Sequence, residues 1–491
     1  MKYKFLGSVV LSAVLVTGFL GCGDDDVVNP NAETDAIAAD LLAASQIVID
    51  ASLVDVNDSD KIPFGDGSFS PFERVAVMPT VKGADGNIDH NATFAKVQRL
   101  AKVFAKFVSE TNEPTEDNAT FKGANWITAG IETSTPTDEL IAQNIIQIPT
   151  KKRINPNFDS SPANTQKVQV IEVCNSTYAA KALGVINVGG ETGAKVPNGI
   201  YHTTALPCEV TIYNDEKAIY VDMLNPETIF TLFFTEVFTD DLMRDNAAFK
   251  ADMLALPSQV KSEIFAMIYN AFDAQGETYS KTAIKMGSVF SSMSKALALP
   301  KIAAPYTHYS YSSTGGKEFT STDAKNIAAQ IMEVMTIHGS PNAGTQESAL
   351  HTALPSMTQA VPANPLWRSG RHEPLKVPGG SWIIEACSPV YAKEALATGE
   401  FHTPALPCEL AVFVNPDDNT TLDVSILNPD FMFKGLFADG MADMNASQIA
   451  GFQNIIDNIN ADLLTIVDYA FEHNVTDIDH STKAQITPIT Y

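Results

Sequence analysis

The chain has 491 residues, of which 58 are Asp or Glu and 32 are Lys or Arg, so its formal net charge at pH 7 is −26. This charge excludes a nucleic-acid-binding protein, because neutralising phosphates requires clustered Lys and Arg. The chain is also too long for one hydrophobic core and suits two domains of about 200 residues each.

The first 22 residues have the layout of a secretory signal, with two lysines, an apolar stretch at 5–20 and then Cys22. The apolar stretch is short for a membrane-spanning helix, which needs about 20 residues. The layout resembles a bacterial lipoprotein signal, in which the Cys22 thiol is acylated and begins the mature chain. Gly23 follows, which by resemblance to other lipoproteins favours the outer membrane. We therefore expect a lipid-anchored protein facing the periplasm, with 23–35 as an acidic tether.

The rest of the chain divides into two repeats. We expect a first repeat domain at residues 36–280, a helical linker at 281–305 and a second repeat domain at 306–491. The same order of strand, helix, strands, helix, hairpin and helices occurs in both. This order predicts an α+β fold, in which each unit packs helices on a mostly antiparallel sheet and ends in helical additions.

The predicted elements of the two repeats correspond in chain order. Alternating apolar residues predict the strands and hairpins, and apolar residues at helical spacing predict the helices. The ranges are 74–78, 92–107, 210–213, 218–223 and 246–273 in the first repeat, and 306–311, 322–335, 410–414, 422–426 and 444–472 in the second. An Asn-Pro pair after each hairpin predicts a capped helix start. We expect the helix at 246–273 to break near Pro257.

Two short motifs are retained in both repeats. Residues 202–209 read His-Thr-Thr-Ala-Leu-Pro-Cys-Glu, and residues 402–409 read His-Thr-Pro-Ala-Leu-Pro-Cys-Glu. Upstream, Ile-Glu-Val-Cys ends at Cys174 and Ile-Glu-Ala-Cys ends at Cys387. Because the two units have diverged elsewhere, the retained positions indicate a site, although they do not indicate a reaction.

These motifs resemble the bacterial family catalogued as domain of unknown function 302. The resemblance rests on residues 172–175 and 205–209 in the first unit and on 385–389 and 405–409 in the second. The family usually has Asn-Pro after the first cysteine, of which only the Asn or only the Pro is present in each unit here. The resemblance implies small α+β domains, often exported, with no established reaction.

The cysteines have three interpretations. With Cys22 lipidated, four remain, in two pairs: Cys174 with Cys208, and Cys387 with Cys408. In an oxidising periplasm such pairs default to disulfides, each stabilising its domain by roughly 3 to 4 kcal/mol. The histidines of the motif would then be turn residues, and the glutamates that end it would be solvated. Thiol redox is a second interpretation, although neighbouring glutamates would raise the thiol pKa values.

The third interpretation is a soft-metal or haem-iron site in each unit. Thiolate and imidazole together suit Cu(I) or Zn(II), although the spacing matches no standard cluster, and no cofactor is required. The proposed ligands are Cys174, His202 and Cys208 in the first unit and Cys387, His402 and Cys408 in the second.

A basic and aromatic patch, residues 367–372, is either a solvated loop or an anion site formed by Arg368 and Arg371. No serine-hydrolase elbow or phosphate-binding loop is present in the sequence. We therefore expect a non-enzymatic binding or structural module with two disulfide-stapled repeats. Its partner would be a small ligand or a periplasmic protein, and it would contact the membrane only through its lipid. The alternative is a periplasmic metal-binding, haem-binding or thiol-redox protein.

Overall fold

The computed structural model describes most of the two predicted repeats. The described residues are 70–110, 126–129, 131, 136–153, 165–206, 208–287, 304–339, 367–369, 371, 373–406, 408–442, 444–474 and 477–489. The predicted signal, Cys22 and the tether lie outside these ranges. No helix within them is long and apolar enough to cross a membrane.

Each repeat contains one antiparallel sheet of seven strands. The strands of the first sheet are β1 (Phe72–Pro79), β2 (Trp126–Thr128), β3 (Ile146–Arg153), β4 (Thr165–Asn175), β5 (Cys208–Asn214), β6 (Ala218–Leu224) and β7 (Ser280–Met286). Those of the second are β8 (Tyr306–Ser312), β9 (Arg368–Ser369), β10 (Leu375–Lys376), β11 (Trp382–Cys387), β12 (Cys408–Val414), β13 (Thr421–Leu427) and β14 (Ala484–Ile486).

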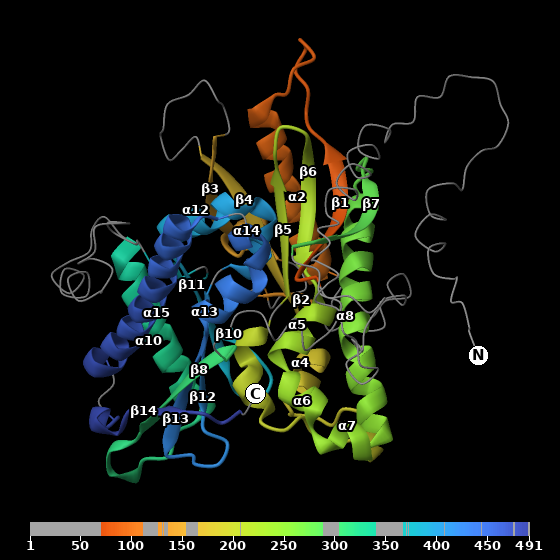
Figure 1. Cartoon of the computed structure of the whole chain (residues 1–491). Coiled ribbons are helices and arrows are strands. Elements are labelled where there is room, and N and C mark those ends of the chain that lie inside the picture. The colour runs from red at the N-terminus through yellow and green to blue at the C-terminus, as the bar shows by residue number, and fades with distance from the viewer. Residues whose placement is uncertain are drawn as a thin grey trace.

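The strand orders are the same in the centre of both sheets: β4-β5-β6-β1-β7 in the first and β11-β12-β13-β8-β14 in the second. At the other edge, β2 and β3 both pair with β4, and β9 and β10 both pair with β11. The predicted α+β fold with two repeated antiparallel sheets is therefore confirmed. Figure 1 shows the two units side by side, the first coloured from orange to green and the second from green to blue.

The helices also correspond between the repeats. Those of the first are α2 (His90–Glu110), α3 (Asp138–Gln143), α4 (Ser176–Ala182), α5 (Pro226–Phe233), α6 (Thr235–Thr239), α7 (Asp241–Asp245) and α8 (Ala247–Asp273). Those of the second are α10 (Ser321–Gly339), α12 (Pro389–Ala395), α13 (Pro429–Phe431), α14 (Ala438–Ala442) and α15 (Ala446–Asn474). The Asn-Pro helix starts are confirmed, because Asn225 accepts from the Glu227 N–H and Asn428 from the Asp430 N–H.

Two predictions about helices are wrong. The predicted helical linker begins with strand β7, where Ser280, Ile284 and Met286 are buried and β1 supplies the pairing partner; residues 288–303 lie outside the described ranges. Helix α8 continues through Pro257. A proline inside a helix costs about 3 kcal/mol, but Met253 and Val260 on either side are buried in the core, and this packing keeps the helix in one piece.

The repeated motifs hold the two units together. Each forms a 3-10 helix, η5 (Gly199–Ala205) in the first unit and η9 (Glu400–Ala405) in the second. Segment η5 packs on β12 and β13 of the second sheet, whereas η9 packs on β4, β5 and β6 of the first. Tyr201 in η5 donates to Asp423 Oδ2 at 2.9 Å, and Phe401 in η9 packs edge-on against Phe72. The exchange is reciprocal, and one continuous apolar core spans both repeats.

Candidate functional site: buried carboxylates between the repeats

Each sheet places two glutamates directly opposite one another. Glu172 in β4 faces Glu209 in β5, and Glu385 in β11 faces Glu409 in β12. Residues opposite one another in an antiparallel pair share a face, and like charges in such pairs destabilise a sheet. All four are between 1% and 4% exposed. The same unfavourable pair is therefore built twice inside the protein.

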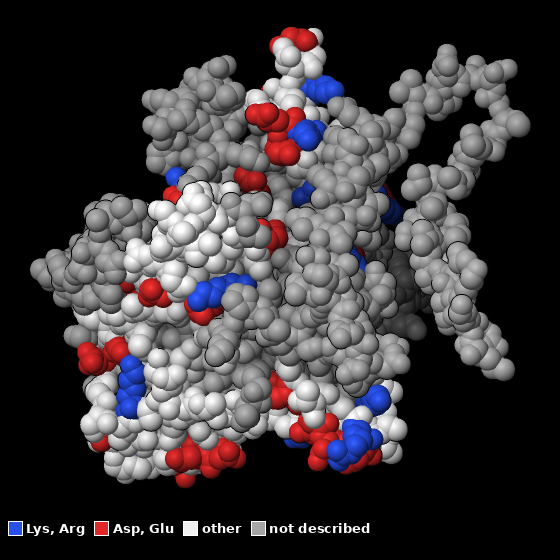
Figure 2. Space-filling model, in the orientation of Figure 1, with Lys and Arg blue, Asp and Glu red and all other residues white. Residues whose placement is uncertain are grey.

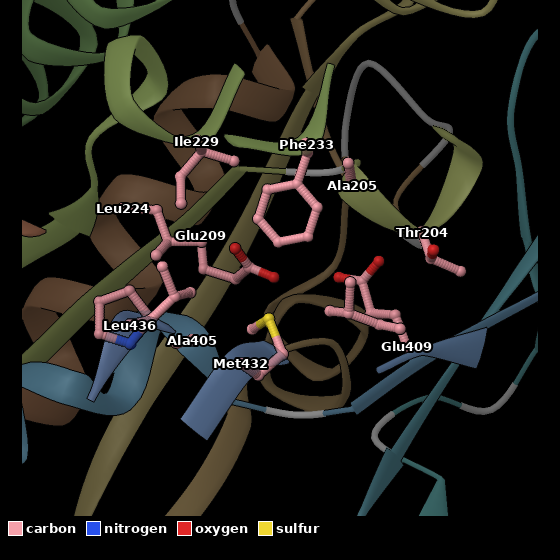
Figure 3. A pocket seen from close by; sticks show the side chains of 12 residues that line it. Thr204, Ala205, Glu209, Leu224, Ile229, Phe233, Ala405, Glu409, Met432 and Leu436 are labelled. Carbon is pink, nitrogen blue, oxygen red and sulfur yellow. The ribbon is translucent and has the colours of Figure 1, made fainter. Parts of the chain in front are cut away.

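The two pairs meet at the contact between the repeats. Oxygen atoms of Glu172, Glu209 and Glu409 lie within 4.8 Å of one another. Glu209 and Glu409 also share a side-chain hydrogen bond. Figure 3 shows these two carboxylates pointing toward each other from opposite sides of a pocket. The first repeat thus supplies two members of the cluster and the second repeat supplies one.

The pocket lies between the two repeats, where equivalent residues of both face one another. It encloses about 310 Å³ of empty space, part of it open to solvent, with room for a water-sized guest. Its twelve lining residues form six equivalent pairs. These are Thr204 and Pro404, Ala205 and Ala405, Glu209 and Glu409, Leu224 and Leu427, Ile229 and Met432, and Phe233 and Leu436. Three of the six pairs belong to the retained motif. That motif therefore builds a single shared pocket.

Arg371 connects the glutamates of the two repeats. Its guanidinium forms ion pairs with Glu172 and Glu385, and the side chain is buried. This arginine was predicted to bind an anion, and here it binds two carboxylates of its own chain. Arg368 does not join it, because it is exposed on β9 opposite Cys387. Trp367 is buried and donates to Asp462 at 2.8 Å, so Trp367 and Arg371 are interior residues rather than parts of a solvated loop.

Burial changes the acidity of this cluster. Burial raises the pKa of Glu209 to about 8, against a smaller opposing effect of the hydrogen bond from Glu409. Burial, and next the charge of Glu209, raise the pKa of Glu409 well above its usual range. Burial also raises the pKa of Glu385, although Arg371 opposes it. Glu409 therefore keeps a proton and donates it to Glu209. On the face shown in Figure 2, by contrast, charged residues are scattered and acidic groups often lie beside basic ones.

The four cysteines of the repeats are free thiols in this structure. Cys208 lies opposite Val173, and Cys408 lies opposite Ala386. Because neighbouring residues of a strand point to opposite faces, Cys174 and Cys208 do not share a face. Cys174 packs in a small apolar cluster, whereas Cys208 packs against the main core. These registers do not suit the predicted disulfides.

The thiols are also poor metal ligands and nucleophiles. Burial raises the pKa of Cys174 to about 12 and, together with the charge of Glu385, raises that of Cys387 to about 12. The pKa values of Cys208 and Cys408 are raised too, first by burial and then by neighbouring anions. Metal binding and thiol exchange both require the thiolate. Neither is favoured at these positions.

The two motif histidines are buried and fully hydrogen-bonded. In His202, Nδ1 donates to the Gly199 carbonyl at 3.2 Å, and Nε2 lies 2.5 Å from Glu236 Oε1 in α6. In His402, Nδ1 lies 2.8 Å from Thr398 Oγ1, and Nε2 lies 3.0 Å from Asp439 Oδ1 in α14. Each ring therefore connects its 3-10 helix to a later helix of the same repeat, α6 in the first and α14 in the second.

The structure does not bring the predicted Cys, His and Cys ligands together. Within the described part of the chain, only Glu172, Glu209 and Glu409 are close enough to hold one metal ion. Glu209 and Glu409 were expected to be solvated, and this expectation is wrong because the opposite repeat covers their face of the sheet. The signal was present in the sequence, since each retained motif contains a glutamate beside its cysteine.

Comparison with known proteins adds no relative. No family model matches the sequence, and neither a curated protein nor a solved structure matches it. The resemblance to the family of unknown function stays a prediction, and the function has to be inferred from the geometry of the shared pocket.

Proposed function

We propose that the protein is a non-enzymatic binding module, anchored by lipid on the periplasmic side of the outer membrane, whose two repeats form one ligand site between them. The observation that carries this proposal is the pocket between the repeats, which is lined by six pairs of equivalent residues. A duplicated fold has no need of buried, opposed carboxylates for its stability. Their presence at a pocket favours a binding role.

The other retained groups support binding rather than thiol chemistry. The thiols are buried with raised pKa values, and both histidines use their two nitrogens within the protein. Both histidines pack on aromatic rings: the centroid of the His202 ring lies 4.2 Å from that of Phe234, and the centroid of the His402 ring lies 5.2 Å from that of Phe72 in the other repeat. The motif thus serves the contact between the repeats.

Native mass spectrometry tests this proposal. The full chain is extracted from membranes in mild detergent, and its mass is compared before and after denaturation. We expect a non-covalent adduct, and we expect Ala405→Leu, which fills the pocket from a residue only 5% exposed, to remove it. An exposed substitution in the first hairpin turn, Glu216→Gln, serves as the control. The proposal is refuted if the wild-type chain carries no adduct and binds no added ion or small molecule.

A further inference from the structure

We propose that the carboxylates of Glu172, Glu209 and Glu409 form a binding site for one hard divalent cation, of the class of Ca²⁺ or Mn²⁺, shared by the two repeats. This inference rests on the proposed binding role and names its ligand. The three oxygens come from β4, β5 and β12, so neither repeat holds the set alone.

The donor atoms select the class of ion. All three ligands are carboxylate oxygens, and oxygen-only sites suit Ca²⁺, Mg²⁺ and Mn²⁺ rather than copper or zinc. Calcium–oxygen distances of about 2.3 to 2.6 Å place ligands on opposite sides of the ion about 4.6 to 5.2 Å apart, whereas Mg²⁺ requires about 4.2 Å. Oxygen separations of no more than 4.8 Å are compatible with three ligands around one Ca²⁺ ion.

Unpartnered oxygens point to a ligand independently of the charge. Among the described residues, no donor reaches Glu172 Oε1, Glu209 Oε2 or Glu409 Oε2, and all three side chains are more than nine-tenths buried. A buried acceptor without a partner costs about 1 to 3 kcal/mol, and more if it is charged. A cation bound by the three carboxylates would supply a partner that these side chains lack, and Glu209 and Glu409 both line the pocket (Figure 3).

When its carboxylates are ionised, the cluster carries an excess of negative charge that a cation would balance. Four buried carboxylates and the single guanidinium of Arg371 carry three negative charges when all are ionised. Uncompensated charge in a protein interior is strongly unfavourable. One divalent ion together with the proton shared by Glu209 and Glu409 neutralises the cluster.

The cluster is not symmetric, so it offers one set of three ligands and not two. Arg371 forms ion pairs with both Glu172 and Glu385, but among the described residues only Glu172 joins Glu209 and Glu409 in a set whose oxygens lie within 4.8 Å of one another. The first repeat has Gly130 in the corresponding place, four residues after Trp126, as Arg371 follows Trp367. The guanidinium thus comes from one repeat alone, and the converging set is Glu172, Glu209 and Glu409.

Calorimetric titration of the full, chelator-treated chain in detergent tests the inference, with CaCl₂, MnCl₂ and MgCl₂ as probes. We expect one ion per chain. Removing a residue that hydrogen-bonds a metal ligand weakens metal binding by about 10- to 100-fold. Replacing two of the ligands themselves, in Glu209→Gln/Glu409→Gln, should therefore weaken it more than about 100-fold. Glu216→Gln should bind as the wild type does.

The outcomes separate this inference from the proposed function. Equal binding by the wild type and the Glu209→Gln/Glu409→Gln variant, or no binding of Ca²⁺ or Mn²⁺ at millimolar concentration and alkaline pH, overturns the cation site. A chain that binds no divalent ion but carries another small adduct, which Ala405→Leu removes, would contradict the cation site and leave the binding role standing. Near-ultraviolet circular dichroism of the variants verifies the fold, which Gln preserves because it matches Glu in size.

Discussion

Replacing Glu209 by Gln should change how stability depends on pH. Burial raises the pKa of Glu209 from 4.5 to about 8 in the folded protein. Between these values the folded state holds a proton that the unfolded chain has released, so the stability that this group contributes is complete below about pH 4.5 and is lost as the pH rises through about 8. The shift corresponds to at most about 5 kcal/mol. The Gln variant lacks this dependence.

Chemical denaturation of the chelator-treated wild type and Glu209→Gln, at about pH 5 and about pH 8.5, measures the effect. Titration of the groups outside the Glu209–Glu409 pair is common to both proteins, so the difference between their free energies of unfolding reports on Glu209 and its coupling to Glu409. We expect the free energy of unfolding of Glu209→Gln, relative to that of the wild type, to be a few kcal/mol higher at about pH 8.5 than at about pH 5. Glu216→Gln, an exposed control, should show no gain. Equal pH dependence in wild type and Glu209→Gln would refute a buried carboxyl of raised pKa.

Three further predictions concern the groups around the site. Arg371→Gln leaves two buried carboxylates without their cation and should destabilise the fold by about 3 to 5 kcal/mol, whereas Arg368→Gln, at an exposed residue, should change stability by less than about 0.5 kcal/mol in urea denaturation. The four cysteines of the repeats should react with iodoacetamide only after unfolding, without added reductant; a mass showing two disulfides would contradict the strand registers. Cys22→Ser should release the protein from the outer-membrane fraction on a sucrose gradient, and an unchanged distribution would argue against lipidation.

Local sequence patterns were enough to predict most of the secondary structure and its order along the chain. The hairpins, the Asn-Pro helix starts and the order of elements could be predicted because each depends on residues close together in the chain. The two errors have non-local causes. Strand β7 is fixed by pairing with β1, about two hundred residues earlier in the chain. Helix α8 passes Pro257 because the residues around it are buried against the rest of the repeat.

The site could be predicted only in part, because the burial of its residues depends on packing between the repeats. The repetition identified the right segments, and alternation along each strand places Glu172 and Glu209 on one face. Whether that face meets water or protein is decided by the other repeat, two hundred residues away. The thiols and imidazoles of the motifs are the groups that the sequence suggests as ligands. In the structure they support the contact between the repeats, whereas the glutamates beside them converge on the pocket.

The most direct test of a shared site is the position of a bound ion. Crystals of the chain soaked with Mn²⁺ should give one anomalous scattering peak per molecule, between Glu172, Glu209 and Glu409 at the contact between the repeats. Two peaks, one beside the cysteines and histidine of each repeat, would contradict this account, as would a pocket that gives no peak at all.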